Sequence, residues 1–201
     1  MRLPNSAHES RPWRIREIAP DFILEDVWAL PTPGDADDFP ALLKLMARSD
    51  PAGSSSLPTR ILWRIRDRLG RLFDLGGISD PAGDATGKLP IPGTSETSLA
   101  ERLPDDLRGT AADVSFGSLP FVPLYLTDDE FAAELSNRTV HAVMHLAWAD
   151  QGEGRYQGQM AVYVKPRGAF GKGYMALIKP FRHLIVYPAL TRQTERAWQR
   201  R

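Results

Sequence analysis

Every second residue between Thr139 and Ala149 is apolar. This alternation predicts a half-buried β-strand, because successive side chains of a strand point to opposite faces of the sheet. His141 and His145 fall on the opposite face. The apolar face consists of Val140, Ala142, Met144, Leu146 and Trp148.

Residues 157–165 alternate in the same way after a loop at 150–155, so the two segments predict an antiparallel hairpin. Matching the apolar faces places Met144 opposite Met160 and His145 beside Gln159. The hairpin should therefore have one dry face and one wet, polar face.

From Tyr174 onwards the apolar period becomes that of a helix. The apolar stripe consists of Tyr174, Leu177, Ile178, Phe181, Leu184, Ile185 and Pro188. We expect one long helix from about Gly173 to Arg200, kinked at Pro188, that buries this stripe on the dry face of the sheet. The predicted fold class is α+β, in one domain over residues 21–201.

The earlier part of the chain is less regular. Three prolines predict an extended arm over residues 1–20, and a first strand follows at 21–30. Turn residues at 31–34 then lead into a short helix over about 39–46.

A second helix is predicted from about Pro58 to Leu75, and residues 76–97 have the composition of a mobile loop. One face of that helix is basic and carries Arg60, Arg64, Arg68 and Arg71. The stripe is either a dock for anionic groups or a solvated face with acidic neighbours, and we favour the second interpretation.

Residues 120–126 indicate an edge strand, because Pro123 cannot donate a hydrogen bond to a neighbour. The next segment, 127–136, fits either a helix begun by a capping box or a strand. We favour the strand, because a two-residue turn after it would match apolar residues, such as Ala133 with Val140.

This order of elements resembles the helix-grip superfamily of START-like and polyketide-cyclase-like (SRPBCC) proteins, and within it one family of unknown function. The resemblance extends over roughly residues 20–198. It is carried by Asp21–Phe22, Arg66–Leu69, Asp74–Gly76, Asp128–Glu130, residues 139–148, Tyr163–Lys165, Gly171–Tyr174 and Lys179–Ile185.

The resemblance implies a curved antiparallel sheet around a long C-terminal α-helix, with two short helices after the first strand. It also implies a hollow that accepts apolar ligands. Since such domains occur appended to oxidoreductase-like domains, an oxidoreductase partner is a further expectation. The long loop at 77–97 and Pro188 depart from the family pattern.

Composition narrows the class of protein. The chain has 25 Lys and Arg against 25 Asp and Glu and no cysteine, so nucleic-acid binding, disulfides and thiol catalysis are not expected. No signal peptide is apparent, and the apolar tracts are shorter than the roughly 20 residues that a membrane span needs. We expect a soluble, cytoplasmic protein.

No motif predicts a nucleophile, a cofactor or a metal site. His141 and His145 lie about 13 Å apart if they are four residues apart on a strand, too far for one ion, so we interpret them as surface histidines. The segment Gly168–Gly173 lacks both common phosphate-binding spacings and is expected to be a hinge between strand and helix.

The leading functional hypothesis is a site for a small hydrophobic molecule between the sheet and the closing helix. The same residues could equally form solid core. A cyclase- or hydrolase-type enzyme is the alternative, with Tyr125, Tyr174 and His183 as its candidate polar groups, and a non-catalytic partner subunit is the third. The expected contacts are Met144, Trp148, Met160, Tyr174, Leu177 and Phe181.

Overall fold

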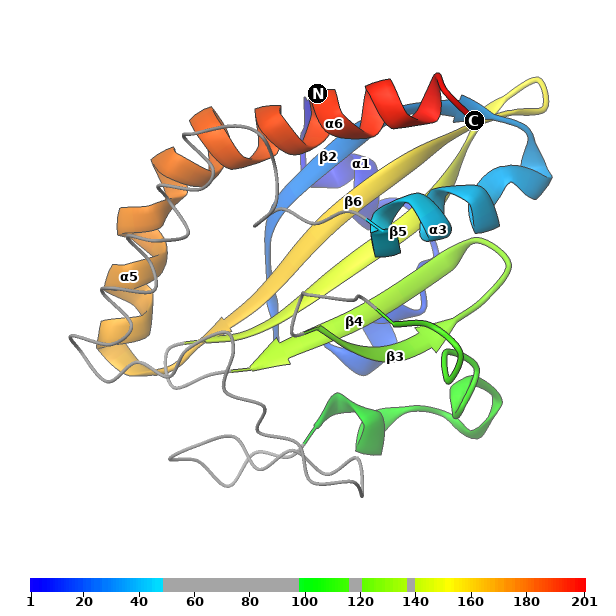
Figure 1. Ribbon diagram of the computed structural model, residues 1–201. Helices are drawn as coiled ribbons and strands as arrows, with labels where there is room; N and C mark the ends of the chain where they lie inside the picture. Colours follow the sequence, from blue (N-terminus) through cyan, green and yellow to red (C-terminus); the bar gives the residue numbers. More distant parts are fainter. Residues whose placement is uncertain (49–97, 116–120, 137–139) are drawn as a thin grey trace.

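A computed structural model describes residues 1–48, 98–115, 121–136 and 140–201. Its centre is one antiparallel sheet of six strands in the order β1-β2-β6-β5-β4-β3 (Figure 1). The expected α+β class is confirmed. The strands are β1 (Arg2–Leu3), β2 (Ile23–Gly34), β3 (Val122–Leu126), β4 (Glu130–Ser136), β5 (Val140–Gly152) and β6 (Arg155–Pro166).

The β5–β6 hairpin is tighter than the predicted loop. Glu153 and Gly154 have positive φ angles of 56° and 71°, as in the two-residue turn that suits the twist of a hairpin. The shorter turn moves the register, so Met144 pairs with Val162 and His145 with Ala161. The predicted pairing of Met144 with Met160 is therefore wrong, although the faces of both strands are as predicted.

The ambiguous segment before this hairpin is a strand, β4, as preferred. Ala133 pairs with Met144 rather than with Val140, so the predicted two-residue connection is also wrong. The register moved by an even number of residues, which keeps apolar side chains on one face. β3 is the edge strand, and its pairing with β4 is irregular between Pro123 and Tyr125.

The first 20 residues do not form the extended arm that was expected. They contain β1 and two single helical turns, α1 (Ser6–Glu9) and α2 (Ile15–Ile18), which bury His8, Ile15 and Ile18 against the sheet. Burial of these side chains outweighs the local preference of the proline-rich sequence. We refer to residues 1–19 as the N-terminal arm.

The predicted turn at 31–34 is also strand, because β2 continues to Gly34 through an irregular pairing between Ala29 and Pro33. The short turn η1 (Ala36–Asp38) begins with a capping box between Asp35 and Asp38 and leads into α3 (Phe39–Arg48), as expected. The second predicted helix, its arginine stripe and the predicted loop at 76–97 lie outside the described residues.

The C-terminal part is an arc of two helices rather than one helix kinked at Pro188 (Figure 1). α5 (Gly168–Phe181) passes into a π-helical turn, η4 (Arg182–Val186), and then into α6 (Tyr187–Trp198). Pro188 lies in the first turn of α6, where its missing N–H costs little. Pro188 has no N–H to donate to the carbonyl four residues before it, so the irregular hydrogen bonding falls in the turn before the proline.

Both faces of the sheet are covered. α3 and α6 cover one face, which we call the helix side, over a core that contains Phe39, Met144, Trp148 and Trp198. The N-terminal arm and the turns η2 (Leu99–Arg102) and η3 (Asp105–Leu107) cover the other, the arm side. The expectation of one wet face was wrong, because segments distant in sequence fold over it.

Candidate functional site

A buried carboxylate organises the polar groups on the helix side of the sheet. The side chain of Asp26 is 0% exposed and accepts a hydrogen bond of 2.6 Å from Nη2 of Arg182. Nε2 of His183 lies 2.5 Å from the other oxygen, and the hydroxyl of Tyr187 donates at 3.2 Å. The three partners come from the junction of α5 and α6. We call these four residues the Asp26 cluster.

Two local irregularities bring these residues together. The pairing of β2 with β6 shifts between Leu24 and Asp26, next to the carboxylate. The partners Arg182 and His183 lie in the π-helical turn, a wider turn that is often found at functional sites. Tyr187 follows directly and packs on Trp28 with ring centroids 4.7 Å apart.

The charges of the cluster are largely compensated within it. Arg182 neutralises Asp26, and Nε of Arg2 lies 3.9 Å from the same carboxylate. Burial, followed by the nearby acidic groups, raises the pKa of Tyr187 above its usual value, so its hydroxyl stays a neutral donor.

His183 is the accessible member, with a side chain that is 20% exposed. When its Nε2–H donates to the carboxylate of Asp26, the lone pair of Nδ1 is left as a hydrogen-bond acceptor. The cluster therefore presents a fixed imidazole with one free acceptor position at a partly open location.

One donor of the cluster has no partner. Nε of Arg182 is buried and, among the described residues, no acceptor lies within hydrogen-bond distance of it. Nη1 of the same guanidinium contacts only the sulfur of Met175, at 3.9 Å, among the contacts described. A buried N–H group without a partner is costly, so this position favours an acceptor supplied from outside the chain.

The predicted contact residues are distributed over two environments. Met144, Trp148 and Met160 are buried together on the helix side, where Nε1 of Trp148 donates to the carbonyl oxygen of Asp35 at 2.8 Å. Leu177 is 63% exposed and does not lie in this core. The side chains of Tyr174 and Phe181 lie outside the described part. Binding by this set stays a prediction.

The same core reaches the Asp26 cluster through one pair of residues. Met160 pairs with Trp28 across β6 and β2, and Trp28 packs against Tyr187. His183 lies near the same indole, with ring centroids 6.2 Å apart, and its ring is 6.1 Å from that of Tyr187. The predicted apolar contacts and the polar cluster are therefore neighbours.

A second polar network lies on the arm side, where His145 and His141 are buried rather than on the surface as predicted. Nε2 of His145 lies 2.9 Å from Glu130, and Nε2 of His141 lies 2.7 Å from Glu134. Glu134 also accepts hydrogen bonds from the hydroxyl of Ser98 and the backbone N–H of Leu99.

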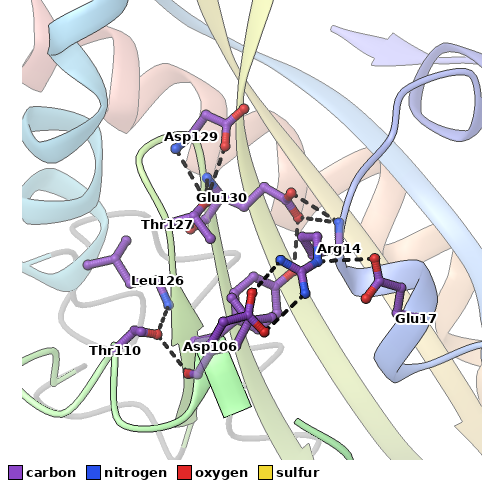
Figure 2. A network of polar contacts seen from close by, with 10 residues as sticks. Arg14, Glu17, Asp106, Thr110, Leu126, Thr127, Asp129 and Glu130 are labelled. Atoms are coloured by element: carbon purple, nitrogen blue, oxygen red, sulfur yellow. Dashed lines mark hydrogen bonds and ion pairs between the residues drawn. The ribbon is translucent and has the colours of Figure 1, made fainter. Parts of the chain in front are cut away.

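Glu130 fastens the N-terminal arm to the sheet. Both of its carboxylate oxygens accept from the backbone N–H of Arg14 at 3.0 Å, while the Arg14 side chain extends to Asp106 and Glu17 (Figure 2). The hydroxyl of Tyr125 donates to the same carboxylate at 2.9 Å. Burial opposes ionisation, but these hydrogen bonds, led by that of His145, keep the pKa of Glu130 below its usual value.

The sequence contained a signal for this network that our interpretation missed. Glu130 and Glu134 are four residues apart on β4, and His141 and His145 are four residues apart on β5. In an antiparallel pair this spacing brings each acid close to one base. Asp26 and His183 gave no such signal, because 157 residues separate them.

The described residues contain no group of three or more His, Asp or Glu side chains arranged to hold a metal ion. None of their helices is long and apolar enough to cross a membrane.

Comparison with known proteins places the chain in a family. Neither curated proteins nor solved structures gave a match. One family model, described as "Protein of unknown function (DUF2867)", matches residues 18–189, which is most of the chain. The chain therefore belongs to the DUF2867 family.

Proposed function

We propose that this protein binds a small, mainly hydrophobic molecule between the sheet and the C-terminal helix, with an oxygen acceptor of the molecule at Arg182. We also propose that the fold is of the helix-grip type. The observation that carries the binding proposal is the buried Nε–H of Arg182 beside the apolar helix side, which has no acceptor among the described residues.

The packing of α5 is consistent with a ligand in this position. Its described apolar contacts with the sheet are made by Met175 and Ile178, against Val140, Val164 and their neighbours. Val162 is only partly buried and borders both this contact and the core around Met160. An apolar ligand body would lie along this border.

The polar end of the proposed site offers the ligand one hydrogen-bond donor and one hydrogen-bond acceptor. Arg182 offers a donor, whereas His183 offers an acceptor at Nδ1 and is partly exposed. A carboxylate or carbonyl oxygen can accept from Arg182 and a hydroxyl group can donate to His183, so a hydroxy-carbonyl compound can use both groups, a carboxylate uses Arg182 alone and a pure hydrocarbon uses neither. We therefore expect an amphipathic ligand with oxygen at one end.

A matched pair of probes tests this assignment. We would measure the binding of a medium-chain fatty acid and of the alcohol of equal length to the purified protein and to Arg182→Lys. Lysine keeps the positive charge beside Asp26 but lacks Nε–H, so the variant should lose affinity for the acid about tenfold and for the alcohol much less. Lys179→Arg is the control, because this exposed residue of α5 keeps its positive charge beside Glu25 and does not contact Asp26 among the contacts described.

Equal affinity of wild-type protein for acid and alcohol, or equal loss of both in Arg182→Lys, would contradict the role of Arg182. Thermal unfolding of each variant shows whether the Asp26 cluster is still intact. Failure of both probes to bind wild-type protein would contradict the binding function itself.

The second candidate is an enzyme of the cyclase or hydrolase type at the same place. The hydrogen bond between Asp26 and His183 favours it, because a carboxylate that orients an imidazole is a common arrangement for general-base catalysis. His183→Asn would then abolish turnover, whereas ligand binding would weaken only by the contribution of the lost Nδ1 acceptor. A binding protein would show no turnover of any bound ligand.

A further inference from the structure

Four aromatic rings meet on the arm side, where the N-terminal arm covers the sheet. The centroid of the His8 ring lies 5.1 Å from His145, 5.8 Å from Trp13 and 5.9 Å from Tyr163. Trp13 and His145 are themselves 5.9 Å apart. Both histidines are 0% exposed. Two of the rings belong to the arm, and two belong to the central strands β5 and β6.

Each ring carries one buried polar atom that lacks a partner among the residues that the structure describes. These atoms are Nε2 of His8, Nδ1 of His145, Nε1 of Trp13 and the hydroxyl of Tyr163, and none has a hydrogen-bond partner in the described part of the chain. Buried polar groups are nearly always bonded to protein or to ordered water. A single bound molecule shared by the four neighbouring rings would satisfy all four atoms.

The hydrogen bonds on the far side of each imidazole determine what the orphaned nitrogens can do. Nδ1 of His8 lies 2.6 Å from Oε1 of Gln159, and Nε2 of His145 lies 2.9 Å from Oε2 of Glu130. Both oxygens are acceptors, so each of these ring nitrogens carries the proton. In the neutral rings, Nε2 of His8 and Nδ1 of His145 are then acceptors.

The remaining two groups are donors. The indole of Trp13 can only donate, and the hydroxyl of Tyr163 can donate as well as accept. The set consists of two acceptors and two donors. A water molecule has two hydrogens and two lone pairs, so it matches this set completely.

We infer that one water molecule is bound between the N-terminal arm and the sheet by His8, Trp13, His145 and Tyr163. It donates to the two imidazole nitrogens and accepts from the indole and the phenol. A metal ion fits less well, because the N–H of Trp13 cannot act as a ligand. The water joins His8 of the arm to His145 and, through it, to Glu130.

Two measurements on the full chain test this inference. A crystal structure at high resolution should show one ordered water within about 3 Å of the four orphaned atoms. Imidazole ¹⁵N NMR should show opposite tautomers, with the proton on Nδ1 in His8 and on Nε2 in His145. The indole N–H of Trp13 should give a cross-relaxation peak with a long-lived water.

A matched substitution separates a bound water from chance geometry. His8→Phe keeps a ring of similar size but leaves only one acceptor for the two hydrogens of the water, so the water density and the cross-relaxation peak of Trp13 should be strongly reduced. Tyr163→Phe keeps both acceptors and the donor of Trp13, so both signals should persist. The inference fails if wild-type crystals show no water there, if native mass spectrometry finds a bound metal, or if His8 is protonated on Nε2.

Discussion

The protein should lose stability at acidic pH because His8 is buried in its neutral form. Burial, and then the neighbouring His145, lower the pKa of His8 from the ordinary 6.5 to about 3. The folded protein therefore holds His8 neutral, whereas the unfolded chain protonates it below pH 6.5. This contribution to stability is fully present above pH 6.5 and is lost as the pH falls towards the folded pKa.

The size of the effect follows from the two pKa values. Each pKa unit corresponds to about 1.4 kcal/mol, so at pH 5 His8 alone should reduce the free energy of unfolding by about 2 kcal/mol relative to neutral pH. For a domain of marginal stability this is a large fraction of the total. Acid should therefore loosen the N-terminal arm, in which His8 lies.

The assay is urea unfolding of wild-type protein and of His8→Asn at several pH values between 7.5 and 5. The asparagine amide can donate to Gln159 as Nδ1 of His8 does, but it does not titrate. The variant should be less stable at pH 7.5, and its deficit should shrink by about 2 kcal/mol at pH 5. Parallel stability curves for the two proteins would refute the reasoning, because other titrating groups cancel in the difference.

Three further predictions concern packing and backbone. Trp148→Phe should lower the free energy of unfolding by about 1–3 kcal/mol, since Trp148 is buried and its indole donates a hydrogen bond to Asp35. Leu177→Ala, on the exposed face of α5, should change it by less than about 0.5 kcal/mol. Denaturant unfolding measures both. Gly154→Ala should destabilise the protein by about 1 kcal/mol, because φ at this residue is 71°. Gly173→Ala should stabilise it by roughly 0.5–1 kcal/mol, because Gly173 lies within α5 and a Cβ there meets no close neighbour. Thermal melts would show both effects. Met160→Trp should destabilise the protein by about 1–3 kcal/mol through overpacking. It should also reduce fatty-acid binding if the ligand lies beside Met160. Unchanged binding in the folded variant would show that the site does not include this core.

Much of the sheet could be predicted from the sequence. The alternation in β5 and β6 assigned each side chain to its face, because a register error of two or four residues leaves the faces unchanged. The pairing partners themselves depended on the lengths of the turns. The turn at Glu153 and Gly154 was misjudged because a glutamate with positive φ is uncommon.

The coverage of the arm side could not be predicted in this way. The N-terminal arm is held by contacts such as His8 with Gln159, which are 151 residues apart, and its helical turns are too short to have a period. The irregularity between α5 and α6 was expected from Pro188, and it lies in the preceding turn, whose carbonyl at residue 184 the proline cannot bond. The π-helical form of that turn was not predicted.

The two polar networks differ in a way that bears on function. On the arm side, Glu130 and Glu134 are each satisfied by several donors from the chain, and both histidines beside them are at most 2% exposed. Nδ1 of His145, which has no partner among the described residues, is fully buried and is assigned to the inferred water. This network therefore stabilises and orients the arm rather than meeting a larger ligand. On the helix side, His183 is partly exposed and Arg182 keeps a donor without a partner among the described residues. Unsatisfied groups beside an apolar surface are retained at a cost to stability, and a ligand that satisfies them recovers that cost. For this reason we place the function of the protein at the junction of α5 and α6.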